Sequence, residues 1–200
     1  MENTVISILN GKGGTGKTTT AIMLGLAFDK LGYSVEVWDA DPQGSALTWS
    51  AAAEDSGNPL PIEVTSVSKP ELQRLRKPHA QVTLIDTPPK YADVLDLAAH
   101  RADLVIIPTA PSAADLSEVI SAKEQLPQDK AAIALLTDAN PRTILYKESL
   151  EALSDMELPV FDAPIKPLQA VKQAFNSRPS DLCGYEDVAQ ELINELEGGA

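Results

Sequence analysis

The stretch LNGKGGTGKTTTA, residues 9–21, contains GKGGTGKT at 11–18 and so satisfies the pattern G-x-x-x-x-G-K-[ST]. It follows an apolar, β-branched run at 4–9 and precedes a helix-like segment that begins near Lys17. Glycines let successive backbone N–H groups point at an anion with no Cβ in the way, and the start of a helix adds a positive dipole end. The stretch therefore predicts a phosphate-binding loop between a strand and a helix.

Side chains of this loop have distinct expected roles. Lys17 reaches the β- and γ-phosphates of a nucleotide, and the Thr18 hydroxyl is a ligand for Mg²⁺. The competing interpretation is a glycine-rich turn without a ligand, which the agreement of strand, spacing and helix disfavours. The residues expected to contact the nucleotide in this loop are Gly11, Gly13, Gly14, Thr15, Gly16, Lys17, Thr18 and Thr19.

The rest of the chain alternates between short apolar runs and helix-like segments. The runs lie at 4–9, 34–38, 81–85, 103–108 and 131–136, with weaker ones at 62–67 and 158–161. The helix-like segments lie at 17–31, 44–54, 69–76, 91–100, 113–125, 143–155, 168–176 and 185–196. This alternation predicts an α/β, single-domain P-loop fold over residues 1–200, with a mostly parallel twisted sheet and helices on both faces.

Three aspartates follow predicted strands. Asp39 and Asp41 come after the run at 34–38, and Asp86 comes after the run at 81–85. Because the carboxyl ends of parallel strands share one edge of the sheet, these side chains are expected near the phosphate loop. Asp86 looks like a Walker-B acid that holds Mg²⁺ directly or through its water shell, although an aspartate at a strand end is often a turn former.

The overall charge restricts how this chain binds nucleic acid. Its 200 residues carry a net charge of −13, which argues against wrapping nucleic acid with the whole surface. A local basic patch remains open, because residues 163–180 hold three cations, Lys166, Lys172 and Arg178, and no acid. These are the candidate DNA contacts, with Arg142 and Lys147 as possible additions; the bland alternative is a set of solvated surface cations.

Targeting and redox signals are weak. No run approaches the roughly 18 apolar residues of a membrane helix, and the N-terminus has no basic n-region. The single cysteine, Cys183, excludes an internal disulfide and fits a reducing compartment. A cytoplasmic location is the expectation.

Four segments in order resemble the ParA/MinD ATPases with a deviant Walker A motif, and most closely the small plasmid-partition ParA proteins. They are KGGTGKTT (12–19), DADPQGS (39–45), LIDTPP (84–89) and DLVIIPTAPSAADL (103–116). The resemblance implies that Lys12 crosses a homodimer interface to the partner's ATP phosphates, where it offsets charge only when the dimer closes. The alternative is that Lys12 is a solvated loop lysine.

Further roles follow from the same resemblance. Asp41 orients the attacking water, Asp39 supports the Mg²⁺ shell, and Lys12, Lys17 and Asp41 form the catalytic set. Adenine contacts are expected in later loops, where Asn140 and Pro164 are the candidates. The activity implied is slow, Mg²⁺-dependent hydrolysis of ATP to ADP and phosphate, in which positioning and electrostatics carry the chemistry.

The leading functional hypothesis is a partition ATPase. Its ATP dimer binds DNA nonspecifically, associates with the nucleoid, and is released when a ParB-like or other small DNA-binding adaptor stimulates hydrolysis, so that plasmid or chromosome DNA is segregated. The alternative within this class is the same motor positioning a protein organelle or a chemoreceptor cluster. A MinD-like membrane-cycling ATPase is disfavoured, because the segment at 186–200 is amphipathic but acidic. A metal-delivery ATPase is disfavoured by the lone cysteine.

Overall fold

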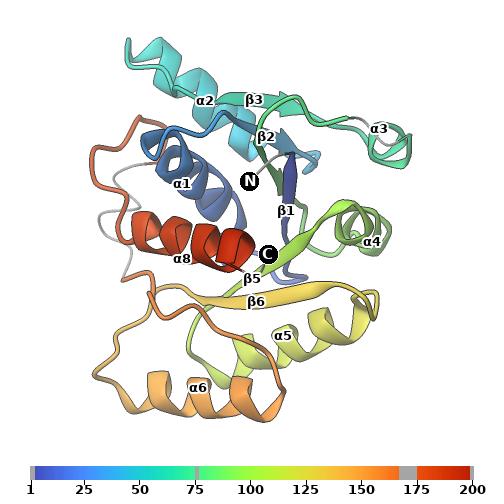
Figure 1. Cartoon of the computed structure of the whole chain (residues 1–200), viewed down its shortest axis with the longest axis vertical. Helices are drawn as coiled ribbons and strands as arrows, with labels where there is room; N and C mark the ends of the chain where they lie inside the picture. The colour runs from blue at the N-terminus through green and yellow to red at the C-terminus, as the bar shows by residue number, and fades with distance from the viewer. Residues whose placement is uncertain (1–2, 75–76, 167–174, 199–200) are drawn as a thin grey trace.

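The strands form one parallel sheet (Figure 1). In the computed structural model, which describes residues 3–74, 77–166 and 175–198, the sheet order is β3-β2-β4-β1-β5-β6 and every neighbouring pair runs parallel. The strands are β1 (Thr4–Ile8), β2 (Val35–Asp39), β3 (Glu63–Ser66), β4 (Val82–Asp86), β5 (Leu104–Thr109) and β6 (Ala131–Leu136). The predicted α/β class with a parallel sheet is confirmed.

Helices cover both faces of the sheet (Figure 1). They are α1 (Lys17–Lys30), α2 (Ser45–Asp55), α3 (Lys69–Gln73), α4 (Ala92–Arg101), α5 (Ala113–Gln125), α6 (Ile144–Asp155) and α8 (Tyr185–Gly198). One core packs α1, α2 and α8 against the sheet, and the second packs α3 to α6 against its other face. Strand alternation supplies both cores: in β1, Ile6 and Ile8 enter the first, and Val5 enters the second.

The register of the strands gathers the expected site on one edge. Ile8 is paired with Asp86, and Asp86 is paired with Asp39 on its other side. The loop that follows β1 therefore leaves the sheet beside the carboxylates that end β4 and β2. This is the carboxyl edge, where open parallel sheets bind their ligands.

Two predicted elements differ from the structure. The run at 158–161 makes a single bridge, between Val160 and Ala134, rather than a strand. Pro159 has no N–H to donate, and the N–H groups of Asp162 and Ala163 donate to the Glu191 carboxylate instead of to a neighbouring strand. The helix predicted at 69–76 ends at Gln73 among the described residues, and most of the one predicted at 168–176 lies outside them.

Candidate functional site

The phosphate loop lies between β1 and α1 and has the backbone shape of an anion cradle. Gly14 and Gly16 have φ angles of 80° and 94°, in the left-handed region that favours glycine. A Cβ placed on Gly13 or Gly14 would meet no atom within 4 Å, so the space beside these two glycines is open. The helix starts directly afterwards, with the Thr20 N–H donating to the Gly16 carbonyl over 2.7 Å. The loop thus presents backbone donors and a helix N-terminus to one space.

Lys17 lies inside this loop. Its side chain is almost fully buried, and its Nζ donates to the carbonyl oxygen of Lys12 over 2.9 Å. Burial lowers the pKa of Lys17, while the charges of Asp86 and Asp41 oppose that change. A buried ammonium held by one carbonyl is under-solvated, and phosphate oxygens are the stronger partners it lacks.

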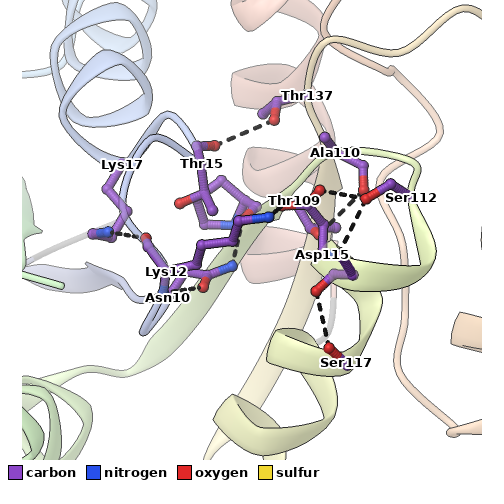
Figure 2. A network of polar contacts seen from close by, with 12 residues as sticks. Asn10, Lys12, Thr15, Lys17, Thr109, Ala110, Ser112, Asp115, Ser117 and Thr137 are labelled. Carbon is purple, nitrogen blue, oxygen red and sulfur yellow. Dashed lines mark hydrogen bonds and ion pairs between the residues drawn. The ribbon is translucent and has the colours of Figure 1, made fainter. Parts of the chain in front are cut away.

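In Figure 2 the side chain of Lys12 points away from that of Lys17 and toward α5. Its Nζ lies 2.8 Å from Asp115 Oδ1, and the Lys12 side chain keeps 40% of its exposure against 14% for Asp115. Ser112, which caps α5, also donates its hydroxyl to Asp115. Burial alone would raise the pKa of Asp115, but the Lys12 and Ser112 contacts outweigh it and lower that pKa. Lys12 is therefore paired with a carboxylate of its own chain.

Asn10 fixes the backbone on which Lys12 sits. Its Oδ1 accepts from the Lys12 N–H over 2.8 Å, and its Nδ2 donates to the Pro108 carbonyl over 2.9 Å. Thr137 adds a third tie, because its hydroxyl donates to the Thr15 carbonyl over 3.2 Å (Figure 2). These contacts attach the loop to β5 and to the segment after β6.

Asp86 has the features of a cation ligand. It is fully buried, and neither carboxylate oxygen has a hydrogen-bond partner among the described residues. Burial raises the pKa of Asp86 to about 7, although the nearby Thr18 hydroxyl opposes that change. An unsatisfied buried carboxylate beside a threonine hydroxyl fits Mg²⁺, which binds through one or two protein oxygens and completes its shell with phosphate oxygens and water. Within the described ranges, no cluster of three His, Cys, Asp or Glu side chains forms a metal site of its own.

The two other aspartates are used differently. Asp39 is buried, and its oxygens accept from the N–H groups of Asp41 at 3.1 Å and Leu47 at 3.0 Å. Burial raises the pKa of Asp39, and those two bonds oppose the change. Asp39 therefore shapes the loop before α2, and its expected support of a Mg²⁺ shell stays a prediction. Asp41 is half-buried and accepts from the Gln43 N–H over 2.9 Å, in the loop that faces the phosphate cradle.

The adenine candidates lie on neighbouring segments. The Ala139 N–H donates to the Ile165 carbonyl over 3.0 Å, which places the loop of Asn140 beside that of Pro164. Asn140 is exposed and its Oδ1 accepts from the Arg142 N–H, while Pro164 is half-buried. Because Thr137 of the same segment touches the phosphate loop, both candidates are at the correct edge; contact with a base stays a prediction.

The candidate DNA patch is only partly described. Lys166 and Arg178 are both exposed, whereas Lys172 lies outside the described residues. Trp49 of α2 fixes the segment before Arg178, since its Nε1 donates to the Ser177 carbonyl over 2.7 Å. Lys166 instead follows the stretch that pairs with the end of β6. The two described cations are thus attached to different elements, and a continuous patch stays a prediction.

Two polar residues that contact Lys12, Asp115 and Asn10, were given no role from the sequence. Asp115 stands in Ser-x-x-Asp, the pattern of a helix start, so its place at the beginning of α5 could be predicted. Its ion pair with Lys12, 103 residues earlier in the chain, could not be predicted. Asn10 carried no signal beyond its position beside the loop.

The fold and this edge together define a P-loop nucleotide-binding protein. Comparison with known families agrees: the model described as CobQ/CobB/MinD/ParA nucleotide binding domain matches residues 6–179. The chain belongs to this family.

Individual relatives carry different names. The maintenance of carboxysome distribution protein A of Gloeobacter kilaueensis is 36% identical over 209 residues, covering 94% of this chain and 93% of the relative. Two solved structures share the fold at lower identity. A putative plasmid partition protein from Borrelia burgdorferi bound to AMPPNP has a TM-score of 0.76 at 16% identity, over 98% of this chain and 100% of that one. The septum site-determining protein MinD of Pyrococcus horikoshii with Mg-ADP has a TM-score of 0.71 at 18% identity, over 98% of both.

Proposed function

We propose that this chain is a Mg²⁺-dependent ATPase whose ATP-bound form is a homodimer, and that the dimer is the working state of a positioning cycle. The observation that carries the proposal is the separation of the two loop lysines. Lys17 is buried in the cradle, while Lys12 is half-exposed at its rim and held by one ion pair. Such a cation can change partner without unfolding any element.

The residues divide the work as follows. The backbone of the loop and Lys17 bind the β- and γ-phosphates, and Thr18 with Asp86 would hold Mg²⁺, which neutralises charge on the phosphates. Asp41, half-buried beside the cradle, orients water for attack on the terminal phosphate. Lys12 leaves Asp115 and contacts the phosphates of the second subunit. Its positive charge then acts in a site from which water is largely excluded, where it counts most.

Light scattering tests the trans role of Lys12. With AMPPNP and Mg²⁺, the unchanged chain is expected to run as a dimer, and Lys12→Ala as a monomer that still binds nucleotide. Lys30→Ala is the matched control, because Lys30 also forms one surface ion pair, with Glu186 at 3.0 Å, at the far end of α1. A dimer of normal stability in Lys12→Ala would refute the trans role.

The cargo proposed first is DNA. The ATP dimer binds DNA without sequence preference through Lys166, Lys172 and Arg178 from both subunits, and an adaptor that binds DNA stimulates hydrolysis and releases it. Removing a cation that touches a DNA phosphate should flatten the dependence of affinity on salt. Replacing the three cations by alanine is expected to weaken a mobility shift with AMPPNP, and replacing Lys30, Lys69 and Lys77 is expected to leave it unchanged. Equal effects of the two triple variants would remove the patch from the proposal.

A second cargo is favoured by one observation, the 36% identity along almost the whole length of a relative named for carboxysome distribution. The same cycle would then position a protein compartment. Deleting the gene separates the two cargoes: loss of plasmid or chromosome copies supports DNA, and clustering of a fluorescently labelled compartment supports the alternative. No helix among the described residues has the length and apolar character needed to cross a membrane.

A further inference from the structure

Helix α6 begins with two adjacent apolar side chains that face solvent. Ile144 keeps 74% of its exposure and Leu145 keeps 55%, the highest values for large apolar residues in the described part of the chain. The buried side of α6 is formed by other residues, Tyr146, Ser149 and Leu153. Neither Ile144 nor Leu145 belongs to the two cores that the described residues build. The fold of one subunit therefore leaves this pair unpacked.

The pair lies at the end of α6 that adjoins the carboxyl edge of the sheet. Thr137, directly after β6, donates its hydroxyl to the Thr15 carbonyl of the phosphate loop over 3.2 Å. The chain then folds into a turn, in which the N–H and the hydroxyl of Thr143 donate to the Asn140 carbonyl over 3.0 and 2.8 Å. Helix α6 starts at the next residue.

The outer face of α6 becomes polar beyond its first turn. The exposed residues that follow the apolar pair on this helix are charged, namely Lys147, Glu148 and Glu151. An apolar stripe for packing along the whole helix would recur every three or four residues, which these do not. The exposed apolar surface of α6 is thus confined to the edge where the nucleotide is expected.

A second copy of this chain is the occupant that this position favours. A dimer that closes over its nucleotides brings the carboxyl edges of two subunits together, and Lys12 then gives up Asp115 for a phosphate. Each subunit carries a net charge of −13, so charge opposes the association. Burial of apolar surface can supply the attraction that these charges do not. We propose that Ile144 and Leu145 of each subunit are buried against the other subunit and hold the ATP-bound dimer together. The choice of a second copy rests on the proposed function.

Symmetry sets the size of the expected effect. In a two-fold dimer the same side chains are buried twice, so one substitution removes two contacts. Leu145 is already half covered within its own subunit, which leaves about half of the side chain to bury. Leu145→Ser should therefore raise the dissociation constant of the dimer about 30-fold, which corresponds to about 2 kcal/mol for the two copies.

Sedimentation equilibrium of the full chain with AMPPNP and Mg²⁺ measures this constant. Leu31→Ser is the matched control, because Leu31 is also an exposed leucine, with 42% of its exposure kept, but stands at the other end of α1 from the phosphate loop. The control should dimerise like the wild type, and the double variant Ile144→Ser, Leu145→Ser should stay monomeric at micromolar concentration. Thermal unfolding without nucleotide should be the same for all of these chains, since the changed side chains are exposed in the single subunit.

The outcomes separate this surface from the role of Lys12. Equal dissociation constants for the wild type and Leu145→Ser, or equal losses in Leu145→Ser and Leu31→Ser, would overturn the proposal. So would a normal dimer of Leu145→Ser that has lost binding to anionic lipid vesicles or to duplex DNA, because the pair would then serve that surface. A dimeric Leu145→Ser beside a monomeric Lys12→Ala refutes the apolar contact alone, and the reverse result refutes the trans lysine alone. A wild type that stays monomeric with AMPPNP contradicts both.

Discussion

Replacing Asp86 by asparagine tests whether the site is built around a cation. Without a cation, the buried carboxyl keeps its proton up to about pH 7 in the folded chain, while the unfolded chain releases it near 3.8. Between these values the folded state binds more protons, so the free energy of unfolding falls as the pH rises. Above pH 7 both states are ionised and the loss is complete.

The magnitude follows from the two pKa values. A difference of about three corresponds to a total of about 4 kcal/mol, of which about 3 kcal/mol falls between pH 5 and pH 8. Asp86→Asn removes the titrating carboxyl group but leaves a side chain of the same size buried at this position. The difference in unfolding free energy, wild type minus variant, should therefore drop by about 3 kcal/mol over that interval.

Urea denaturation at several pH values without Mg²⁺ or nucleotide measures this difference, and the exposed Asp129→Asn serves as the control. Adding Mg²⁺ with ADP should raise the free energy of unfolding of the wild type more at pH 8 than at pH 5. The same addition should raise that of Asp86→Asn only slightly. If the pH curves of wild type and Asp86→Asn run parallel, the carboxyl is not held in a desolvated, cation-seeking state and the reasoning fails.

Three other changes address single contacts. Lys17→Ala should raise the dissociation constant for ATP at least 100-fold in titration calorimetry, because it removes about 3 kcal/mol of charge-assisted contact with phosphate; an unchanged constant would remove Lys17 from the site. Asp41→Ala should bind ATP and form a dimer but release no phosphate. A normal release rate would mean that another group orients the attacking water. Glu36→Gln should destabilise the fold by about 2–4 kcal/mol in urea, because the buried Glu36 carboxylate accepts from Trp38, Thr83 and His79, where an amide supplies an unwanted donor; a smaller loss would mean that these donors find other acceptors.

The sequence predicted the main elements because their signals are local. The apolar run at 4–9 and the four runs like it became β1, β2, β4, β5 and β6, and the glycine pattern at 11–18 became the phosphate loop. Local signals failed at 158–161, where the apolar pattern is that of a strand but Pro159 has no N–H, and the next two N–H groups, of Asp162 and Ala163, donate to the Glu191 carboxylate.

Polar partners distant in the chain could not be predicted. The sequence placed Asp39 and Asp86 at strand ends alike, and only the packing shows that Asp39 is satisfied by backbone N–H groups while Asp86 is not. Likewise, Glu36 stands in a strand as if it faced solvent, yet it is fully buried among three donors. The donors to Asp39 lie only two and eight residues further along the chain, in a turn whose shape the sequence did not reveal. Two of the three donors to Glu36, Thr83 and His79, lie 47 and 43 residues away, so their contact with it depends on tertiary packing.

The ion pair between Lys12 and Asp115 has a thermodynamic consequence for assembly. If Lys12 crosses to a second subunit, its ion pair with Asp115 is broken for each contact that it makes with the partner's phosphates. Dimerisation therefore exchanges one ionic contact for another and adds no further ion pair from this lysine. Added salt weakens both sides of such an exchange, and the dimerisation constant should therefore vary little with ionic strength. Replacing Asp115 with asparagine would remove the competing contact and make association both tighter and more sensitive to salt.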